Sequence, residues 1–325
     1  MFSRIAINNN YNIPSIAFVL VISFNFLPNF SFAWANEEGV GKFRKSVTKI
    51  LSNACLRKNN YGIKIYSLDL GETLYEIRSK KLFIPASNLK ILTTAAALKF
   101  LGSNYRFATR IDTDGILENE TLKGNLYIKG SGDPKLVTEQ LWLMVNELRN
   151  LPIKRIEGNI IGDDTFFDNQ KRVKTWIQNP GAQAYEAPLG ALSFNFNTVK
   201  VYVSPGKKVG DQPIIVIEPK NEYIKLENNA QTLRPGKRRR LIVNRVGKES
   251  HDLITVSGGI NIGQPRSQYF LNITNPIQYA LNVFKSYIDL SGIKFAGKLQ
   301  QGKVPDGALE LYIHEGEPLA LALRG

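Results

Sequence analysis

Apolar residues recur at helical spacing in four segments of the chain. Residues 41–57 predict an amphipathic helix, and residues 89–101 predict a strongly apolar helix that stops at Gly102. Two further helices are expected at 135–150 and 276–290. The last of these carries one apolar face, formed by Tyr279, Ala280, Val283, Phe284 and Tyr287.

Strand-like runs separate these helices. Residues 62–68 and 73–78 predict a β-hairpin joined by Asp69-Leu70-Gly71-Glu72. After about residue 108 the pattern changes to short strands separated by Gly, Pro, Asn and Asp. The expected strands are 124–129, 155–161, 199–203, 213–217, 223–226, 241–246 and 253–256. The pattern therefore predicts a mixed α/β domain, beginning within residues 36–108 and interrupted by one or two β-rich inserted units over 109–300.

The first 35 residues have the composition of an export signal. A basic start with Arg4, an apolar stretch from Ile13 to Leu27 and the exit Ala33-Trp34-Ala35 predict a signal peptide, cleaved before Asn36. Two prolines and Asn25 argue against a permanent membrane span, although an uncleaved anchor remains the alternative. We therefore expect an exported protein in the periplasm or cell envelope.

Export changes how the charge of the chain is interpreted. The formal net charge is +14, which inside a cell would suggest nucleic acid as a partner. Outside the cytoplasm, an anionic cell wall or a membrane surface is the more natural partner. The basic run at 237–240 follows Pro235-Gly236 and fits a solvated turn, and no aromatic residues are interleaved with it, so we expect no nucleic-acid binding.

The residue inventory excludes several chemistries. The only histidines are His251 and His314, and no Gly-x-Ser-x-Gly element occurs, which disfavours a Ser-His-Asp hydrolase. No thiolate zinc site can form from the single cysteine, Cys55, which we interpret as a small core residue. We expect neither a metal nor a cofactor, although carboxylates alone could still bind a metal.

The chemistry that the residue inventory leaves open is nucleophilic attack by a serine that a lysine activates. Ser and Lys three residues apart on a helix project from one face, so the amine can accept the hydroxyl proton. This spacing occurs four times, at Ser46/Lys49, Ser87/Lys90, Ser204/Lys207 and Ser291/Lys294. Only Ser87 opens a long apolar helix, which we expect to bury Lys90 in the core and lower the pKa of its amine. The alternative is a serine that caps an ordinary helix.

Residues 85–98, which include Ser87 and Lys90, resemble the active-site segment of the class C low-molecular-mass penicillin-binding proteins, the D-alanyl-D-alanine carboxypeptidase/endopeptidases. Further similar segments follow in the family's order. The first is 126–134. The second runs from Ile156 to Asn159 and continues with Asp163 and Phe166-Phe167. The third combines Tyr185 with 191–195, and the fourth combines Asn275-Pro276 with Ala280. The resemblance therefore extends over nearly all of the chain after residue 35.

The resemblance implies a serine transpeptidase-like α/β domain interrupted by β-rich insertions, with a return to that domain over 301–325. It implies hydrolysis of the D-Ala-D-Ala end or crosslink of peptidoglycan stem peptides, and covalent inhibition by β-lactams. By resemblance Ser87 is the nucleophile, Lys90 is the general base and the Ser87 N–H is an oxyanion donor. Asp163 matches an acidic residue that in some members helps to recognise the amino group of the stem's diamino acid.

The chain also departs from the family pattern. Residues 1–325 contain no Lys-Thr-Gly, Lys-Ser-Gly or His-Thr-Gly, and Ser193-Phe194-Asn195 lies too early to be the family's Ser-x-Asn element. Residues 314–324 resemble the segment that precedes that element. We therefore expect a truncated member with little or no turnover. The alternatives are a non-catalytic wall-binding protein and, disfavoured by the long insert, a β-lactamase or serine esterase.

Overall fold

The computed structural model describes residues 37–53, 56, 59–173, 181–237 and 240–324. The predicted signal peptide and Cys55 lie outside the described residues. The chain divides into two compact units, one ending at Leu101 and the other beginning at Gly102. Within the described residues, no helix has the length and apolarity needed to cross a membrane.

The first unit contains the two helices and the hairpin that the pattern predicts. Helix α1 spans Glu37–Leu51, strands β1 and β2 span Ile63–Ser67 and Glu72–Ile77, and a 3-10 turn η1, Ala86–Asn88, leads into helix α3, Leu89–Leu101. β1 and β2 pair antiparallel from Ile63 opposite Ile77, and Gly71 adopts a positive φ of 66° in the connecting turn. The predicted hairpin is therefore confirmed.

The second unit is built around a mixed five-stranded sheet with the order β16-β8-β6-β3-β17. Its strands are β3 (Arg106–Thr113), β6 (Leu126–Gly130), β8 (Ile160–Asp163), β16 (Leu299–Gln301) and β17 (Leu309–Pro318). The first and last of these in the sequence pair antiparallel, so chain segments about 200 residues apart are neighbours. Short helix α6, Leu319–Ala322, follows β17.

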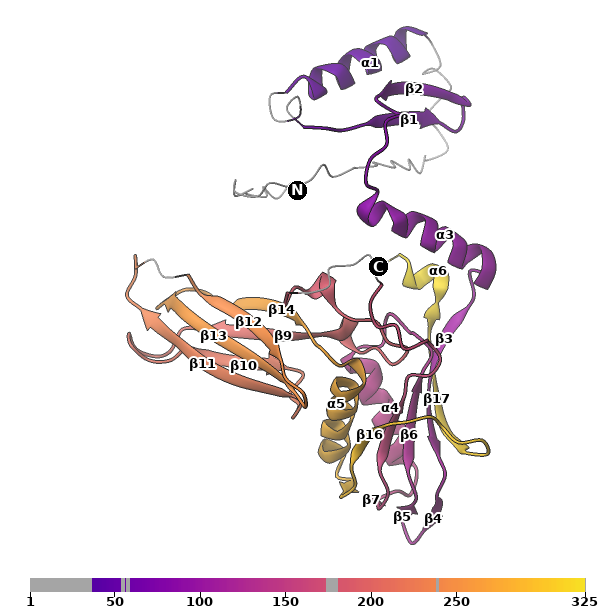
Figure 1. The fold of residues 1–325 in the computed structure, drawn as a ribbon, viewed down its shortest axis with the longest axis vertical. Coiled ribbons are helices and arrows are strands. Elements are labelled where there is room, and N and C mark those ends of the chain that lie inside the picture. Colours follow the sequence, from indigo (N-terminus) through magenta and orange to yellow (C-terminus); the bar gives the residue numbers. More distant parts are fainter. Residues whose placement is uncertain (1–36, 54–55, 57–58, 174–180, 238–239, 325) are drawn as a thin grey trace. The chain divides into compact units, whose positions relative to one another are not determined.

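Helices α4 (Thr138–Asn150) and α5 (Pro276–Ser291) lie side by side next to this sheet (Figure 1). The sequence sets both ends of α5. Asn275 caps it by accepting a hydrogen bond from the Gln278 N–H at 3.2 Å, Pro276 occupies its first turn, and Gly292 ends it at a φ of 84°. Four residues of the predicted face are buried, and the fifth, Tyr287, is partly buried.

A second sheet has the order β15-β7-β5-β4 and corrects one sequence prediction. Its strands are β4 (Ile116–Glu118), β5 (Thr121–Lys123), β7 (Arg155–Ile156) and β15 (Lys294–Phe295). The single strand predicted at 155–161 is wrong, because β7 and β8 belong to different sheets. Gly158 packs directly on the Gly124 backbone between them, where no side chain fits.

The β-rich remainder forms two three-stranded sheets. One has the order β10-β9-β14, with β9 (Thr198–Ser204), β10 (Ile214–Glu218) and β14 (Ser267–Asn272). The other has the order β11-β13-β12, with β11 (Ile224–Leu233), β12 (Ile242–Gly247) and β13 (Asp252–Asn261). Alternate residues of β9 and β13 are buried in one continuous core, including Val199, Val201, Val203, Ile254 and Val256. This is the alternation expected of strands with one solvent face.

The mixed α/β architecture with several sheets agrees with the fold class expected from the sequence. The predicted domain limits, 36–108, 109–300 and 301–325, are not tested by the division into compact units and remain a prediction. Two 3-10 turns complete the described elements of the second unit, η2 at Ala184–Glu186 and η3 at Asn195–Asn197.

Candidate functional site

Ser87 lies in the 3-10 turn immediately before helix α3. The Asn88 N–H donates to the Pro85 carbonyl at 2.9 Å, and the Leu89 N–H points to the carbonyls of Ala86 and Ser87. Lys90 is the second residue of α3, so both side chains belong to the first turns of one continuous helical segment. This places the Ser87 hydroxyl near the positive end of the helix, which favours negative charge on its oxygen.

The residue before Ser87 has an unusual backbone conformation. Ala86 adopts a φ of 45°, in the left-handed region that residues with a Cβ rarely occupy. Such conformations cost on the order of 1–3 kcal/mol and cluster at functional sites, where they fix the direction of a side chain. Of the four serines with Ser-x-x-Lys spacing, Ser87 is the one that follows such a residue.

The expected burial of Lys90 is wrong for the described chain. No residue of α3 is buried, and Ser87 and Lys90 are both exposed. The prediction rested on the apolar composition of the helix, and a helix that is apolar on all sides packs inside a protein when partners surround it. Among the described residues of the first unit, no element covers α3.

The other three Ser-x-x-Lys pairs have different surroundings. Ser204 ends strand β9 and Lys207 follows in a loop, while Ser291 ends α5 and donates to the Ile288 carbonyl at 2.7 Å. Ser46 and Lys49 both lie within α1, away from its start. Ser87 is therefore the one serine of the four at the beginning of a helix whose next turn carries the lysine.

Asp163 lies in the second unit and is fully buried at the end of β8. Its Oδ1 accepts hydrogen bonds from the Thr165 N–H at 2.8 Å and the Thr165 hydroxyl at 2.7 Å. Its Oδ2 accepts from the Val304 N–H at 2.9 Å and lies 4.0 Å from the Lys129 ammonium. These contacts give the carboxylate internal partners, so the predicted role in substrate recognition rests on the resemblance.

Three segments that carry the family resemblance meet in the second unit. The Gly132 N–H donates to the Ala191 carbonyl at 2.7 Å, and the Leu192 N–H donates to Asp164 Oδ1 at 2.7 Å. The Phe167 ring packs so closely on Gly132 that no side chain would fit there, and Gly132 also has a positive φ of 86°. Segments that are widely spaced in sequence thus form one packed cluster.

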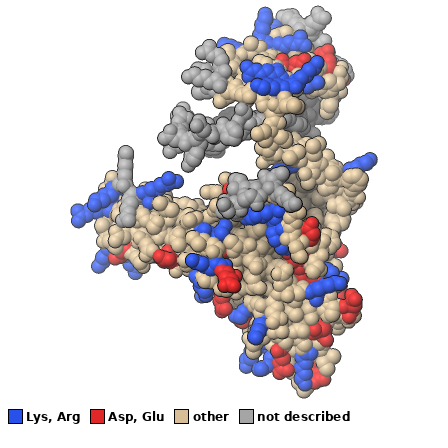
Figure 2. All heavy atoms as spheres, viewed as in Figure 1, with Lys and Arg blue, Asp and Glu red and all other residues tan. Residues whose placement is uncertain are grey.

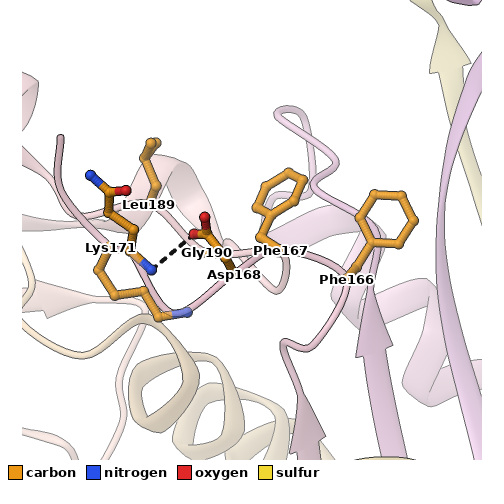
Figure 3. Close-up of a pocket in the computed structure, with 7 residues that line it drawn as sticks. Phe166, Phe167, Asp168, Lys171, Leu189 and Gly190 are labelled. Atoms are coloured by element: carbon orange, nitrogen blue, oxygen red, sulfur yellow. Dashed lines mark hydrogen bonds between the residues drawn. The ribbon is translucent and has the colours of Figure 1, made fainter.

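A pocket of about 350 Å³ lies beside this cluster (Figure 3). It is lined by Phe166, Phe167, Asp168, Gln170, Lys171, Leu189 and Gly190. Lys171 forms an ion pair with the buried Asp164, and Asp168 accepts from the Gln170 N–H at 2.9 Å. The lining has aromatic rings and a neutralised cation but no hydroxyl, thiol or imidazole, so it suits binding rather than covalent catalysis. No sequence signal marked the Asp164–Lys171 pair.

Asp133, in the same cluster, is a buried carboxyl with one unsatisfied oxygen. Its Oδ1 accepts from the Lys135 N–H at 2.8 Å, whereas Oδ2 has no hydrogen-bond partner among the described residues. Burial raises the pKa of Asp133, and the nearby His314 acts in the opposite direction. Burial lowers the pKa of His314. Asp133 follows strand β6 and His314 lies within β17, and the charge of each group affects the pKa of the other.

Ser193 and Asn195 have internal hydrogen bonds, in keeping with their interpretation as a chance match to Ser-x-Asn. Ser193 donates to the Gly190 carbonyl at 2.7 Å, and Asn195 Oδ1 accepts from the Thr138 N–H at 3.1 Å. Phe194 between them is fully buried. In the described part of the chain, no group of three or more His, Cys, Asp or Glu side chains could hold a metal ion.

The profile of the D-Ala-D-Ala carboxypeptidase 3 (S13) family matches residues 43–324. The chain is 27% identical over 271 residues to a D-alanyl-D-alanine carboxypeptidase of Actinomadura sp. (strain R39), covering 81% of this chain and 50% of that protein. It is 26% identical over 153 residues to the D-alanyl-D-alanine carboxypeptidase DacB of Haemophilus influenzae, covering 47% of this chain and 32% of that protein.

Among solved structures, penicillin binding protein 4 (dacB) from Haemophilus influenzae has a similar fold. The TM-score is 0.67 at 22% identity, covering 79% of this chain and 56% of that chain. The same protein complexed with a β-lactam gives a TM-score of 0.60. The chain spans about half the length of the curated relatives that it matches.

Proposed function

The chain belongs to the D-Ala-D-Ala carboxypeptidase 3 (S13) family, and from this premise we propose that Ser87 and Lys90 are the acylating pair of a peptidoglycan D-Ala-D-Ala carboxypeptidase/endopeptidase. The main support for the proposal is the structure at the start of helix α3. Ser87 opens helix α3 after a left-handed Ala86, with Lys90 in the next turn, inside the segment that matches the family.

The proposed reaction proceeds through an ester on Ser87. Lys90 accepts the hydroxyl proton as the serine oxygen attacks the carbonyl carbon of the penultimate D-Ala. The peptide C–N bond then breaks, and the leaving amine takes the proton. Water hydrolyses the ester and restores the serine. A β-lactam would acylate the same oxygen through its ring carbonyl, and the ring C–N bond would break in place of the peptide bond.

We further propose that this chain turns substrate over slowly. Residues 1–325 contain no Lys-Thr-Gly, Lys-Ser-Gly or His-Thr-Gly element to bind the terminal carboxylate. The predicted signal peptide would place the reaction in the periplasm or cell envelope, with domain limits as expected from the sequence.

Penicillin labelling tests the proposed pair. Prolonged incubation with a fluorescent penicillin should give a slow adduct, located on Ser87 by mass spectrometry, and Ser87→Ala should abolish it. Lys90→Gln should slow labelling by roughly a hundredfold, because general-base catalysis contributes at least that much. The matched control Ser204→Ala removes a serine with the same Ser-x-x-Lys spacing and should label like the parent chain.

Two outcomes would contradict the proposal. An adduct that persists in Ser87→Ala, or that maps to another serine, would remove Ser87 from the reaction. Labelling that is complete within minutes would instead show that the chain needs no further carboxylate-binding element.

A non-catalytic wall-binding protein is the second candidate, and the net charge of +14 favours it. Sedimentation with purified cell walls separates the two functions. Equal binding by the parent chain and Ser87→Ala, with no soluble peptide released by either, would favour the binding protein. Release of D-Ala by the parent chain alone would favour the enzyme.

A further inference from the structure

Three loops meet at one end of the two three-stranded sheets. They are residues 205–213 between β9 and β10, 234–241 between β11 and β12, and 262–266 between β13 and β14. The Gly206 and Gly210 N–H groups donate to the Thr232 side chain and carbonyl, each at 2.8 Å, and the Ile262 N–H donates to the Leu233 carbonyl at 2.8 Å. We call the described residues of these loops the basic end (Figure 1).

The basic end has a strong excess of positive charge. Its described residues include six exposed cations and one acid, Asp211. The cations are Lys207, Lys208, Arg234, Lys237, Arg240 and Arg266. None of the six takes part in a salt bridge among the described residues. Lys and Arg gather at the outer end of these strands in Figure 2. Like charges held together without counter-charges favour an anionic ligand.

An aromatic surface adjoins these loops. The outer face of β9 and β14 carries Tyr202 and Phe270, and the Arg266 guanidinium lies 3.5 Å from the centre of the Tyr202 ring. The Lys200 ammonium lies 5.7 Å from the centres of both rings. Lys200 also lies 3.9 Å from Glu218, the acid on this face. The rings therefore hold two cations in place beside the basic end.

Part of the same sheet face is apolar, although a face in contact with water is ordinarily polar. Ile214 and Val216 on the edge strand β10 are both exposed, and Phe270 is 47% exposed. An antiparallel sheet with one face in water ordinarily alternates apolar-in and polar-out. A ligand with both apolar and anionic parts fits a surface that combines aliphatic groups, rings and held cations.

We propose that the basic end and this sheet face bind the glycan strands of peptidoglycan as a non-catalytic surface. The carboxylates of stem peptides pair with the loop cations, and the apolar faces of the sugar rings pack on Phe270 and its neighbours. This inference rests on the proposed function for its choice of wall as partner. The spread of cations over three loops suits a polymer rather than a small molecule.

Nucleic acid fits this surface less well than peptidoglycan does. Proteins that bind single strands without sequence preference line up several open rings on which successive bases stack. Arg266 covers one face of Tyr202, so Phe270 is the ring of this pair left for stacking. Peptidoglycan requires cations and an apolar surface but no series of open rings.

Co-sedimentation with purified insoluble peptidoglycan tests the charge requirement. The measurement uses the full chain carrying Ser87→Ala, so that binding is read without acylation or cleavage. The triple variant Lys207→Gln, Lys208→Gln, Arg266→Gln should bind on the order of tenfold more weakly, and the loss should shrink as salt is raised. A second triple variant, Lys294→Gln, Lys298→Gln, Lys303→Gln, removes the same charge from exposed lysines elsewhere and should bind like the parent.

Equal weakening by both triple variants would overturn the proposal. Binding would then depend on the net charge of the chain and not on where the cations lie. Matching thermal unfolding midpoints of the two variants verify that each is folded. The test reads binding in Ser87→Ala, so it stays informative if penicillin labelling removes Ser87 from the reaction.

A charge-neutral pair of variants tests the aromatic surface. Phe270→Leu should weaken sedimentation about threefold, because the ring is lost while apolarity is kept. The control Trp142→Leu removes a ring that is 52% exposed on α4 and should have no effect. The parent chain should bind peptidoglycan more tightly than chitin, which has the sugar rings without the stem carboxylates. Tighter binding to single-stranded DNA than to peptidoglycan would overturn the choice of partner.

Discussion

Ser87 and Asp163 illustrate how differently two predicted site residues can be placed. Ser87 is exposed after a left-handed Ala86, with no element packed over it among the described residues of its unit. Asp163 is fully buried, and both of its carboxylate oxygens accept backbone N–H groups. The first arrangement presents a side chain for reaction, and the second joins strand β8 to the segments that follow β8 and β16.

Asp163→Asn should lower the free energy of unfolding by about 2 kcal/mol. The amide replaces one hydrogen-bond acceptor with a donor, which leaves the N–H of Thr165 or of the buried Val304 without its acceptor. Urea unfolding followed by circular dichroism measures the change. Asp168→Asn is the control, because its exposed carboxylate accepts one loop N–H and the variant should change stability by less than about 0.5 kcal/mol. A stable Asp163→Asn would contradict a structural role and favour substrate recognition.

Helix α3 is the element whose sequence and surroundings disagree most. Nine of its thirteen residues are apolar, yet none is buried, and Phe100 is 84% exposed. An apolar surface of this kind on a folded protein marks a place where another surface packs. The helix therefore forms from its own sequence without the packing that its composition suits.

The exposed face of α3 should bind the dye ANS. Leu92→Glu with Phe100→Glu should reduce the ANS fluorescence of the chain by roughly half, because both side chains are exposed and apolar. Leu290→Glu with Trp142→Glu is the matched control on α5 and α4, with two exposed apolar residues exchanged for the same charges. Equal losses in both double variants would place the dye on general apolar surface rather than on α3.

At the scale of the whole molecule, the apolar core lies in the second unit. The continuous cluster of buried apolar side chains runs from Ile111 to Ile293 and joins the five-stranded sheet, both long helices and the two three-stranded sheets. In the first unit, α3 has no buried residue and the hairpin strands are at most partly buried. The two units should therefore differ strongly in stability.

Residues 102–325 should fold on their own. Expressed alone, they should unfold cooperatively, with a thermal midpoint within about 3 °C of the main transition of the full chain, because a single domain with its own core unfolds in one step. Scanning calorimetry of the two proteins measures both midpoints. A fragment that shows no cooperative transition would mean that the first unit contributes to this core.

Local pattern predicted most of the elements in the described chain. Periodicity gave α4 and α5 to within a few residues, the hairpin β1–β2, and strands such as β9 and β12, because each depends on its own alternation and turn residues. It failed at 155–161, where the break between β7 and β8 depends on which sheet each half joins. It also overestimated the burial of Lys90, because burial depends on what packs against a helix.

The sequence by itself determined the helix-opening position of Ser87, the spacing to Lys90 and the family resemblance, since these depend on neighbouring residues along one segment. Tertiary structure decided the rest. It buried Asp163 among backbone donors, paired Lys171 with Asp164, and brought together three loops that look like separate solvated turns along the chain. Their charges combine into one basic surface because strand pairing sets which loops are neighbours, and pairing between distant strands is not encoded in any one of them.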